Sequence, residues 1–416
     1  MLKAPGRALA CALLALGPLA EAGELELHGF GAARGIEVES RSAWIDGGFG
    51  RLTEGEGAAA FAALARAEAQ LAIDWTPSPV FLLRVHGAAR TEPGASGGER
   101  VGLTQAFLQY RPELRPDVAL RVRAGLQFAE TSRENTGALW QSPYTLTFSA
   151  LNSWIGEELR PLGLDVALQL GEPGRSRFEL AGMAFGGADT AGALLAWRGW
   201  AMGTRLSVVG ETLPLPPLPT LQPGGAFGEQ QRSGTRPLDE LDGRIGWQAR
   251  GRWSRSGVGL VQASFTDTRG DRGLHDGQYA WATRFASTGA EAQLGPLRLV
   301  AEGLAGETGM GIPTAAHVDL RIRAAYALVS WAKPDGAVRL TARYDVFHDE
   351  DRDGTAEPNG ESGWAVTVAG FWTPRPWLRL GLEYLYLEGD RPAAAFSGTA
   401  RGAGAERAQA ELRLRF

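Results

Sequence analysis

Residues 407–416, RAQAELRLRF, decide the fold class of this chain. Successive side chains of a β-strand point to opposite faces, so strict alternation of apolar and polar residues gives a strand with one face of each kind. The apolar set here is Ala408, Ala410, Leu412, Leu414 and Phe416, and the polar set is Arg407, Gln409, Glu411, Arg413 and Arg415. The stretch therefore predicts an amphipathic strand that ends on an aromatic residue.

The same alternation recurs along the chain, and no segment of comparable length has a convincing helical period. It is clearest at residues 67–75, 120–128, 164–170, 245–253, 338–346 and 378–386. The pattern predicts an all-β protein. We expect about eighteen strands, with sixteen as the alternative, because residues 36–65 and 187–210 are only weakly patterned.

The predicted connections are of two kinds. Short turns rich in Pro and Gly occur near residues 77–79, 171–174, 254–257, 295–296, 334–336 and 374–376, and longer polar segments occupy 91–100, 130–160, 211–240, 267–277, 307–316, 348–362 and 389–403. Short turns at one end and long loops at the other are typical of a transmembrane antiparallel β-barrel. A soluble periplasmic sandwich is the alternative, but it has no reason to sort its connections by length.

Aromatic residues gather beside the short turns. They are Trp75, Tyr110, Trp253, Trp331, Trp372, Trp377 and Phe416. Rings with one polar edge favour the boundary between membrane and water. We interpret this set as an aromatic girdle at the level of the turns.

Several segments carry a resemblance to a known family. A terminal amphipathic strand ending in Phe resembles the closing strand of bacterial outer-membrane barrels, and residues 134–137, 140–144, 152–158 and 344–347 resemble segments of porin-like outer-membrane proteins of Proteobacteria. The resemblance implies a passive channel in the outer membrane, contact with lipid and lipopolysaccharide, assembly by the barrel-assembly machinery through the terminal strand, and a homotrimer.

Residues 1–22 resemble a secretory signal peptide, with a basic start, a short apolar stretch and a small-x-small site at Ala20-Glu21-Ala22. We expect one barrel domain over residues 23–416. The chain has one cysteine, Cys11, which lies inside this leader, so the mature part has no thiol or disulfide. A formal charge of -5 is too small to indicate a nucleic-acid partner or a membrane-surface partner.

The polar faces of the predicted strands are rich in arginine. The expected pore-lining residues are Arg121, Arg123, Arg244, Arg250, Arg252, Arg339, Arg343, Asp345, Arg379 and Glu383. Rings of fixed charge in a narrow pore set its ion selectivity, so the set favours an anion-leaning channel for small hydrophilic solutes or ions. The alternative is that these residues pair across neighbouring strands and only stabilise the wall.

The segment 130–160 is the candidate constriction loop. It is long, follows a well-patterned strand, and mixes aromatic and charged residues, of which Arg133, Glu134, Trp154, Glu157 and Glu158 are the candidates. At sixteen to eighteen strands the barrel interior is wide and is partly filled by loops. A loop that caps the barrel from outside is the alternative.

Asp349, Asp351 and Asp353 precede Gly354 and resemble the start of a calcium-binding loop. The closing acid of such a loop should stand at 360, which is Gly360 here. The alternative is an acidic external loop near divalent ions held by lipopolysaccharide. We expect no other cofactor.

Other barrel functions need features that the sequence supplies only in part. A hydrolase needs a nucleophile with His and an acid; His275-Asp276 and His348-Asp349 are fragments of such a set without a nucleophile signature. A transporter of hydrophobic compounds needs an amino-terminal hatch, and the first predicted strand begins too early for one. We therefore expect a channel and no enzyme.

Overall fold

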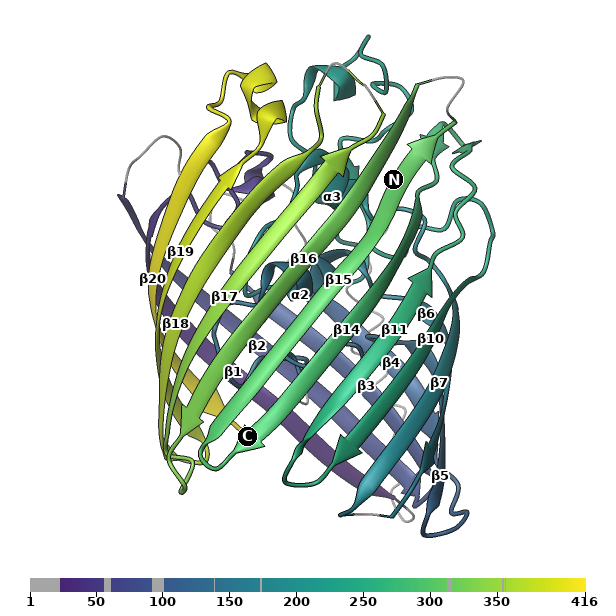
Figure 1. The fold of residues 1–416 in the computed structure, drawn as a ribbon, viewed down its shortest axis with the longest axis vertical. Helices are drawn as coiled ribbons and strands as arrows, with labels where there is room; N and C mark the ends of the chain where they lie inside the picture. The colour runs from purple at the N-terminus through teal and green to yellow at the C-terminus, as the bar shows by residue number, and fades with distance from the viewer. Residues whose placement is uncertain are drawn as a thin grey trace, which may run out of the picture.

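A computed structural model describes residues 23–55, 61–91, 101–137, 139–172, 174–312, 316–353, 355 and 357–416. Sixteen antiparallel strands form one closed barrel (Figure 1). The predicted signal peptide, residues 1–22, lies outside the described residues. Among the described residues, no helix has the length and apolar character needed to cross a membrane.

The barrel strands follow the order of the chain. They are β1 (Glu24–Glu39), β2 (Phe61–Ser78), β3 (Phe81–Arg90), β4 (Val101–Tyr110), β5 (Val118–Leu126), β6 (Leu162–Leu170), β7 (Ser176–Gly186), β10 (Gly246–Arg255), β11 (Gly259–Asp267), β14 (Ala282–Leu294), β15 (Leu297–Gly311), β16 (His317–Ala332), β17 (Val338–Asp351), β18 (Glu361–Arg375), β19 (Leu378–Asp390) and β20 (Gly402–Arg415). Two small hairpins, β8 (Leu213–Pro214) with β9 (Gly234–Thr235) and β12 (Leu274–His275) with β13 (Gln278–Tyr279), lie in the loops.

Pairing of β1 with β20 closes the barrel, in a register that runs from Phe30↔Arg415 to Glu39↔Glu406. The prediction of an amphipathic strand at residues 407–416 is confirmed. Its polar side chains, such as Arg407 and Glu411, are buried inside the barrel, whereas Leu412 and Leu414 are exposed on the outer wall.

The preferred count of eighteen strands is wrong, and the alternative of sixteen is right. The two weakly patterned stretches do not supply an extra pair of wall strands. In the first, β1 continues to Glu39 and is followed by a loop with a short 3-10 helix, η2 (Trp44–Asp46). In the second, residues 187–245 form one long connection that holds α3 (Ala193–Trp197). Residues 188–208 are buried without alternation, because they pack inside the barrel rather than between lipid and lumen.

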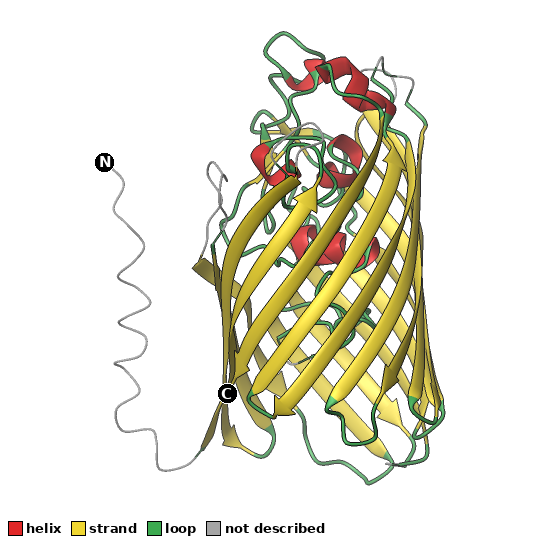
Figure 2. Ribbon diagram, turned by 90° about the vertical axis from the view of Figure 1, so that its left-hand side faces the viewer, coloured by secondary structure: helices red, strands yellow, loops and turns green. Residues whose placement is uncertain are grey.

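The connections are sorted by length, as predicted. The tight turns lie together at one end of the barrel, and the loops with their helices lie at and within the other end (Figure 2). The connection expected at 307–316 is an exception. It is short, because β15 continues through Gly311 and β16 begins at His317. We call the two ends the turn end and the loop end.

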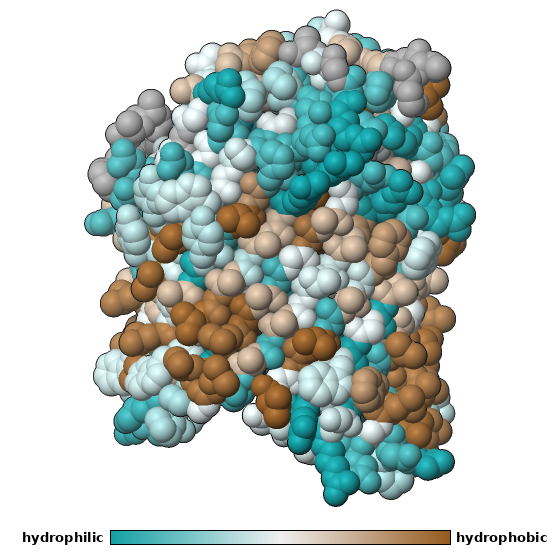
Figure 3. Space-filling model, viewed as in Figure 1, coloured by the Kyte–Doolittle hydropathy of each residue, from teal (hydrophilic) through white to brown (hydrophobic). Residues whose placement is uncertain are grey.

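The outer wall carries the apolar side chains. Hydrophobic residues gather on the middle and lower wall, and hydrophilic residues dominate the loop end (Figure 3). Near the turns, the outward rings of Tyr110, Trp331, Trp372, Trp377 and Phe416 are exposed, as expected for a girdle. In water this exposed apolar surface would be unfavourable, so the wall requires a lipid environment.

Candidate functional site

The loop between β5 and β6, residues 127–161, folds into the barrel. Its helix α2 (Ala150–Glu158) lies inside the ring of strands (Figure 2). The backbone N–H of Thr147 donates to Glu383 of β19 over 3.1 Å, and that of Ala150 donates to Asp345 of β17 over 3.2 Å. The loop therefore reaches the opposite wall, and the alternative of an external cap is wrong.

Arg343 of β17 is the main attachment of this loop to the wall. Its side chain is fully buried. The guanidinium pairs with Glu134 of the loop and donates to the carbonyl oxygens of Thr147 over 2.7 Å and Phe148 over 3.2 Å. On its own strand, Nε donates to Asp345 over 2.8 Å. The Arg343 guanidinium thus neutralises two buried carboxylates and donates hydrogen bonds to two loop carbonyls. A buried charge is stable only when it is paired and hydrogen-bonded in this way.

Carboxylates hold the start of α2. Glu134 accepts from Ser149 N–H over 2.9 Å and from the Asn152 amide over 3.0 Å. Glu302 of β15 accepts from the same amide over 2.9 Å and from Arg133 N–H over 2.8 Å. Ser149 itself caps the helix through Asn152 N–H. The predicted residues Arg133 and Glu134 therefore lie in the lumen, where Glu134 anchors the loop.

Trp154, Glu157 and Glu158 also lie inside, but they join two loops instead of facing water. Glu158 accepts from Trp154 Nε1 over 2.7 Å and from the N–H groups of Gly192 and Leu194, at the start of α3, over 2.9 and 3.0 Å. Burial raises the pKa of Glu158 to about 7, against the opposing effect of these hydrogen bonds. Glu157 pairs with Arg198 of the second loop over 2.8 Å.

A buried aromatic core lies in the loop-end half of the interior. It contains Trp44, Trp154, Trp197, Trp200 and Trp281, all buried, from four different loops. Apolar wall residues such as Leu320 and Ile322 of β16 pack against them. Sequence reasoning did not predict this core. The signal was residues 193–202, ALLAWRGWAM, which are apolar without strand alternation.

The turn-end half of the interior is charged. Arg121 and Arg123 of β5 pair with Glu130 at 2.8 and 2.5 Å, and Arg252 of β10 donates to the Glu130 carbonyl over 3.0 Å. Beside them, Arg250 lies 3.5 Å from Asp165 of β6. Burial by itself would raise the pKa of Glu130, but the neighbouring guanidinium groups reverse the effect and hold it below its usual value.

The remaining predicted arginines lie on the inner face, with one exception. Arg339 donates to Ser330 over 2.9 Å, and Arg379 donates to Glu411 over 2.7 Å. Arg244 does not lie on the wall. It precedes β10, is half-exposed, and lies 4.0 Å from Asp271 of another loop. The alternation that we extended back to Arg244 belongs to the loop, because the strand begins only at Gly246.

The structure does not bring Asp349, Asp351 and Asp353 together as calcium ligands. The first two belong to β17, whose extended backbone separates alternate side chains, and their carboxylates bind Trp200 Nε1 and the N–H groups of Asp353 and Asn359. Within the described part of the chain, no close group of metal-ligating atoms includes them.

The two hydrolase fragments are also separated. On β17, His348 is exposed on the outer face and Asp349 is buried on the inner face. His275 bonds Asp271, at 2.9 Å, in an external loop. The partner of His275 is therefore Asp271 and not the adjacent Asp276, and His348 and Asp349 lie on opposite faces of β17.

No family model matches this chain, and no curated protein matches it either. Solved structures do match over almost its whole length. The outer membrane channel DcaP of Acinetobacter baumannii aligns with a TM-score of 0.54 at 12% identity, over 95% of this chain and 98% of that one. An anion-selective porin from Comamonas acidovorans aligns with a TM-score of 0.52 at 10% identity, over 95% and 100%. The trimer form of OmpT, an outer membrane protein of Vibrio cholerae, aligns with a TM-score of 0.52 at 11% identity, over 95% and 100%.

The fold is that of the outer-membrane porins. At these identities the likeness establishes the architecture. A porin-like barrel with an apolar outer wall belongs in the bacterial outer membrane.

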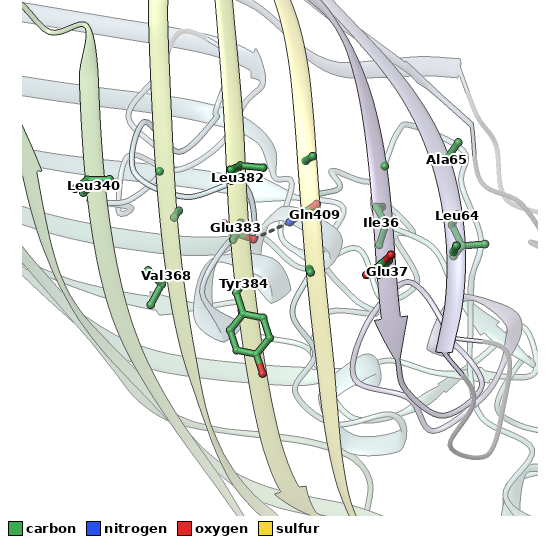
Figure 4. Close-up of a pocket in the computed structure, with 16 residues that line it drawn as sticks. Ile36, Glu37, Leu64, Ala65, Leu340, Val368, Leu382, Glu383, Tyr384 and Gln409 are labelled. Carbon is green, nitrogen blue, oxygen red and sulfur yellow. Dashed lines mark hydrogen bonds between the residues drawn. The ribbon is translucent and has the colours of Figure 1, made fainter.

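The porin-like barrel also has a groove on its outer wall. It measures about 930 Å³ and crosses the strands β17 to β20, β1 and β2 (Figure 4). Its floor is made of small outward residues, including Gly35, Ala65 and Ala410, whereas Leu340 and Leu382 project beside it. The groove faces the membrane and is separate from the interior.

Proposed function

We propose that this protein is a channel for small hydrophilic solutes or ions, with a preference for anions. The observation that carries the proposal is the arginine-rich inner wall of the turn-end half. Arg121, Arg123 and Arg252 remain partly exposed to the interior there. Fixed positive charge along a pore raises the local concentration of anions.

Two further ion pairs of the inner wall expose their arginine more than their carboxylate, whereas Glu130, with 26% of its side chain exposed, is more exposed than Arg121 and Arg123. Arg298 keeps 42% of its side chain exposed while its partner Glu291 keeps 13%, and Arg84 keeps 20% while Asp74 keeps 6%. The preference for anions therefore rests on the number of arginines around Glu130, where Arg121, Arg123 and Arg252 surround one carboxylate. Pairing across strands and lining of the pore are compatible roles, because an ion pair uses only part of the guanidinium fork.

A non-catalytic role is part of the proposal. The two His-Asp fragments are separated, and the Glu130 carboxylate is held in ion pairs with Arg121 and Arg123. Several proteins of similar fold are described as porins or channels, including the two from Acinetobacter and Comamonas.

Purified protein in planar bilayers tests the channel. With a gradient of KCl across the membrane, we expect ion current whose reversal potential has the sign of chloride selectivity. The double variant Arg121→Gln/Arg123→Gln should shift the reversal potential toward zero. The matched control Arg321→Gln changes an arginine on the outer face of β16 and should leave it unchanged. Cation selectivity would reject the anion preference, and the absence of current in folded wild type and folded Arg343→Met alike would reject the channel.

We further propose a homotrimer that uses the small-residue groove of Figure 4 as its contact face. Small side chains let two membrane-embedded surfaces approach closely, as they do between helices. One protein of similar fold was solved in a trimer form. Gly35→Leu should lower the trimer fraction in cross-linking and native electrophoresis, whereas Leu164→Ile, on the outer face of β6, should not. A monomer in mild detergent would contradict this arrangement.

A further inference from the structure

Three loops of the barrel interior form one packed unit. They are the described parts of residues 40–60, 127–161 and 187–245, and we call them the luminal plug. Met202 N–H donates to the Arg51 carbonyl over 2.8 Å, Phe148 N–H donates to the Gly203 carbonyl over 2.9 Å, and Ser207 N–H donates to the Gly156 carbonyl over 3.1 Å. Backbone hydrogen bonds thus connect each loop to another, so the plug is a defined structure and not three separate loops.

The core of the plug is continuous with apolar residues of the wall on several sides. These wall residues include Ile36 of β1, Phe185 of β7, Phe285 of β14, Leu320 of β16, Phe347 of β17 and Leu385 of β19. Each of them is at most 4% exposed. An apolar layer of this kind opposes the passage of ions on the sides where it meets the wall, because an ion cannot lose its hydration there without compensation.

Buried ion pairs join the plug to the wall. Arg343 of β17 holds Glu134, Arg407 of β20 holds Glu54 over 2.7 Å, and Glu361 of β18 holds Arg51 over 2.6 Å. The three pairs reach β17, β18 and β20, on one side of the barrel. The backbone bond from Val209 N–H to the Leu103 carbonyl, 2.9 Å long, joins the plug to β4 on another side. The plug is therefore attached to the wall through ion pairs and a hydrogen bond as well as through its apolar core.

We propose that the luminal plug is a gate. This proposal rests on the channel function proposed above and goes beyond it. With the plug seated, the charged turn-end half of the interior is a vestibule closed toward the loop end. Ions cross the barrel only when the plug moves away from the wall, and the buried ion pairs of Arg343, Arg407 and Glu361 set how often it moves.

A reversible cross-link tests the gate. A Cβ built on Gly102 of β4 lies 2.9 Å from the Cβ of Val208 in the plug. A disulfide spans about 3.5–4.5 Å between Cβ atoms, so a shift of roughly 1 Å accommodates one. The double variant Gly102→Cys/Val208→Cys should lock the plug when oxidised and release it when reduced. The single variants Gly102→Cys and Val208→Cys are the controls for the thiols alone.

The readout is single-channel recording before and after reductant, with folding checked by heat-dependent mobility on gels. We expect the oxidised double variant to open at least about tenfold less often than the reduced form, since a disulfide restricts the displaced state. The single variants should not respond to reductant. In a second experiment, Arg343→Met should raise the open probability of the otherwise native chain.

The results separate the gate from the channel. Stable current that is the same in oxidised and reduced double variant, with a verified disulfide, would overturn the gate while the channel stands. The absence of current from wild type, reduced double variant and Arg343→Met, all folded, would overturn both. Rare openings of wild type that become frequent in Arg343→Met would support both.

Discussion

Gly29 and Phe416 pair at the seam where the barrel closes. Gly29 N–H donates to the Phe416 carbonyl over 3.0 Å, and Phe416 N–H donates to the Gly29 carbonyl over 3.1 Å. A Cβ on Gly29 would overlap the Phe416 ring, so the ring lies directly over the glycine. The aromatic ring of the last residue thus occupies the space that a side chain at Gly29 of the first strand would fill.

Gly29→Val should weaken this seam. The larger side chain must displace the Phe416 ring, and overpacking of this kind costs about 1–3 kcal/mol. We expect a lower yield of folded barrel and a lower temperature of unfolding on heat-modifiability gels. The matched control is Gly31→Val on the same face of β1, where a Cβ meets nothing within 4 Å. Equal loss of stability in both variants would show that strand flexibility, not the ring, matters.

Arg343→Met should detach the luminal plug from β17. The change leaves the buried Glu134 and Asp345 without their cation, and breaking a buried pair in this way typically costs about 3–5 kcal/mol. We expect faster limited proteolysis of residues 127–161 and a lower denaturant midpoint of tryptophan fluorescence. Arg321→Met is the matched control. Its pair with Glu350 is exposed, so the change should stay within about 0.5 kcal/mol.

The stability of the plug should fall as the pH rises toward neutrality. In the folded protein Glu158 has a pKa of about 7, above that of an ordinary glutamate, so the folded state keeps the proton longer than the unfolded state. The stability that this proton contributes is present below about pH 4 and is lost through about pH 7, on the order of 3 kcal/mol.

Glu158→Gln should remove that pH dependence, because the amide does not ionise. Denaturant unfolding followed by tryptophan fluorescence at pH 5 and pH 8 measures it, since Trp154 Nε1 donates to Glu158. The wild type should lose stability between the two values and the variant should lose less. An identical loss in both would assign the dependence to other groups.

Glu130→Gln should increase anion selectivity. Glu130 is the carboxylate shared by Arg121 and Arg123, and its neutralisation leaves their charge uncompensated in the vestibule. We expect the reversal potential in a KCl gradient to move further toward that of chloride. Glu350→Gln, at an exposed position of β17 outside the pore, should have no effect. An unchanged reversal potential would mean that the charged groups near Glu130 do not act on permeating ions.

The wall of the barrel could be predicted from the sequence because its signal is local. Alternation in residues 407–416 identifies a strand whose two faces meet different solvents, and the sorted connections place the two ends of the barrel. Inner arginines such as Arg121 and Arg250 follow from the same alternation. Arg244 was wrongly assigned to the wall because alternation does not show where a strand begins. Pairing with neighbouring strands sets that boundary, and β10 begins at Gly246.

The contents of the barrel were decided by tertiary structure. The sequence of residues 193–202 indicates a buried segment but not its place in the fold. The closed wall supplies the apolar residues against which this segment packs. Likewise, the residues near Glu134 in the sequence do not indicate that its ion-pair partner is Arg343, which lies 209 residues away. Amphipathic alternation and the sorting of the connections by length together determined a membrane barrel of sixteen or eighteen strands, because both can be read from neighbours in the chain. The choice of sixteen, the luminal plug and the partner of each charge required the folded chain, because they depend on contacts between residues far apart in sequence.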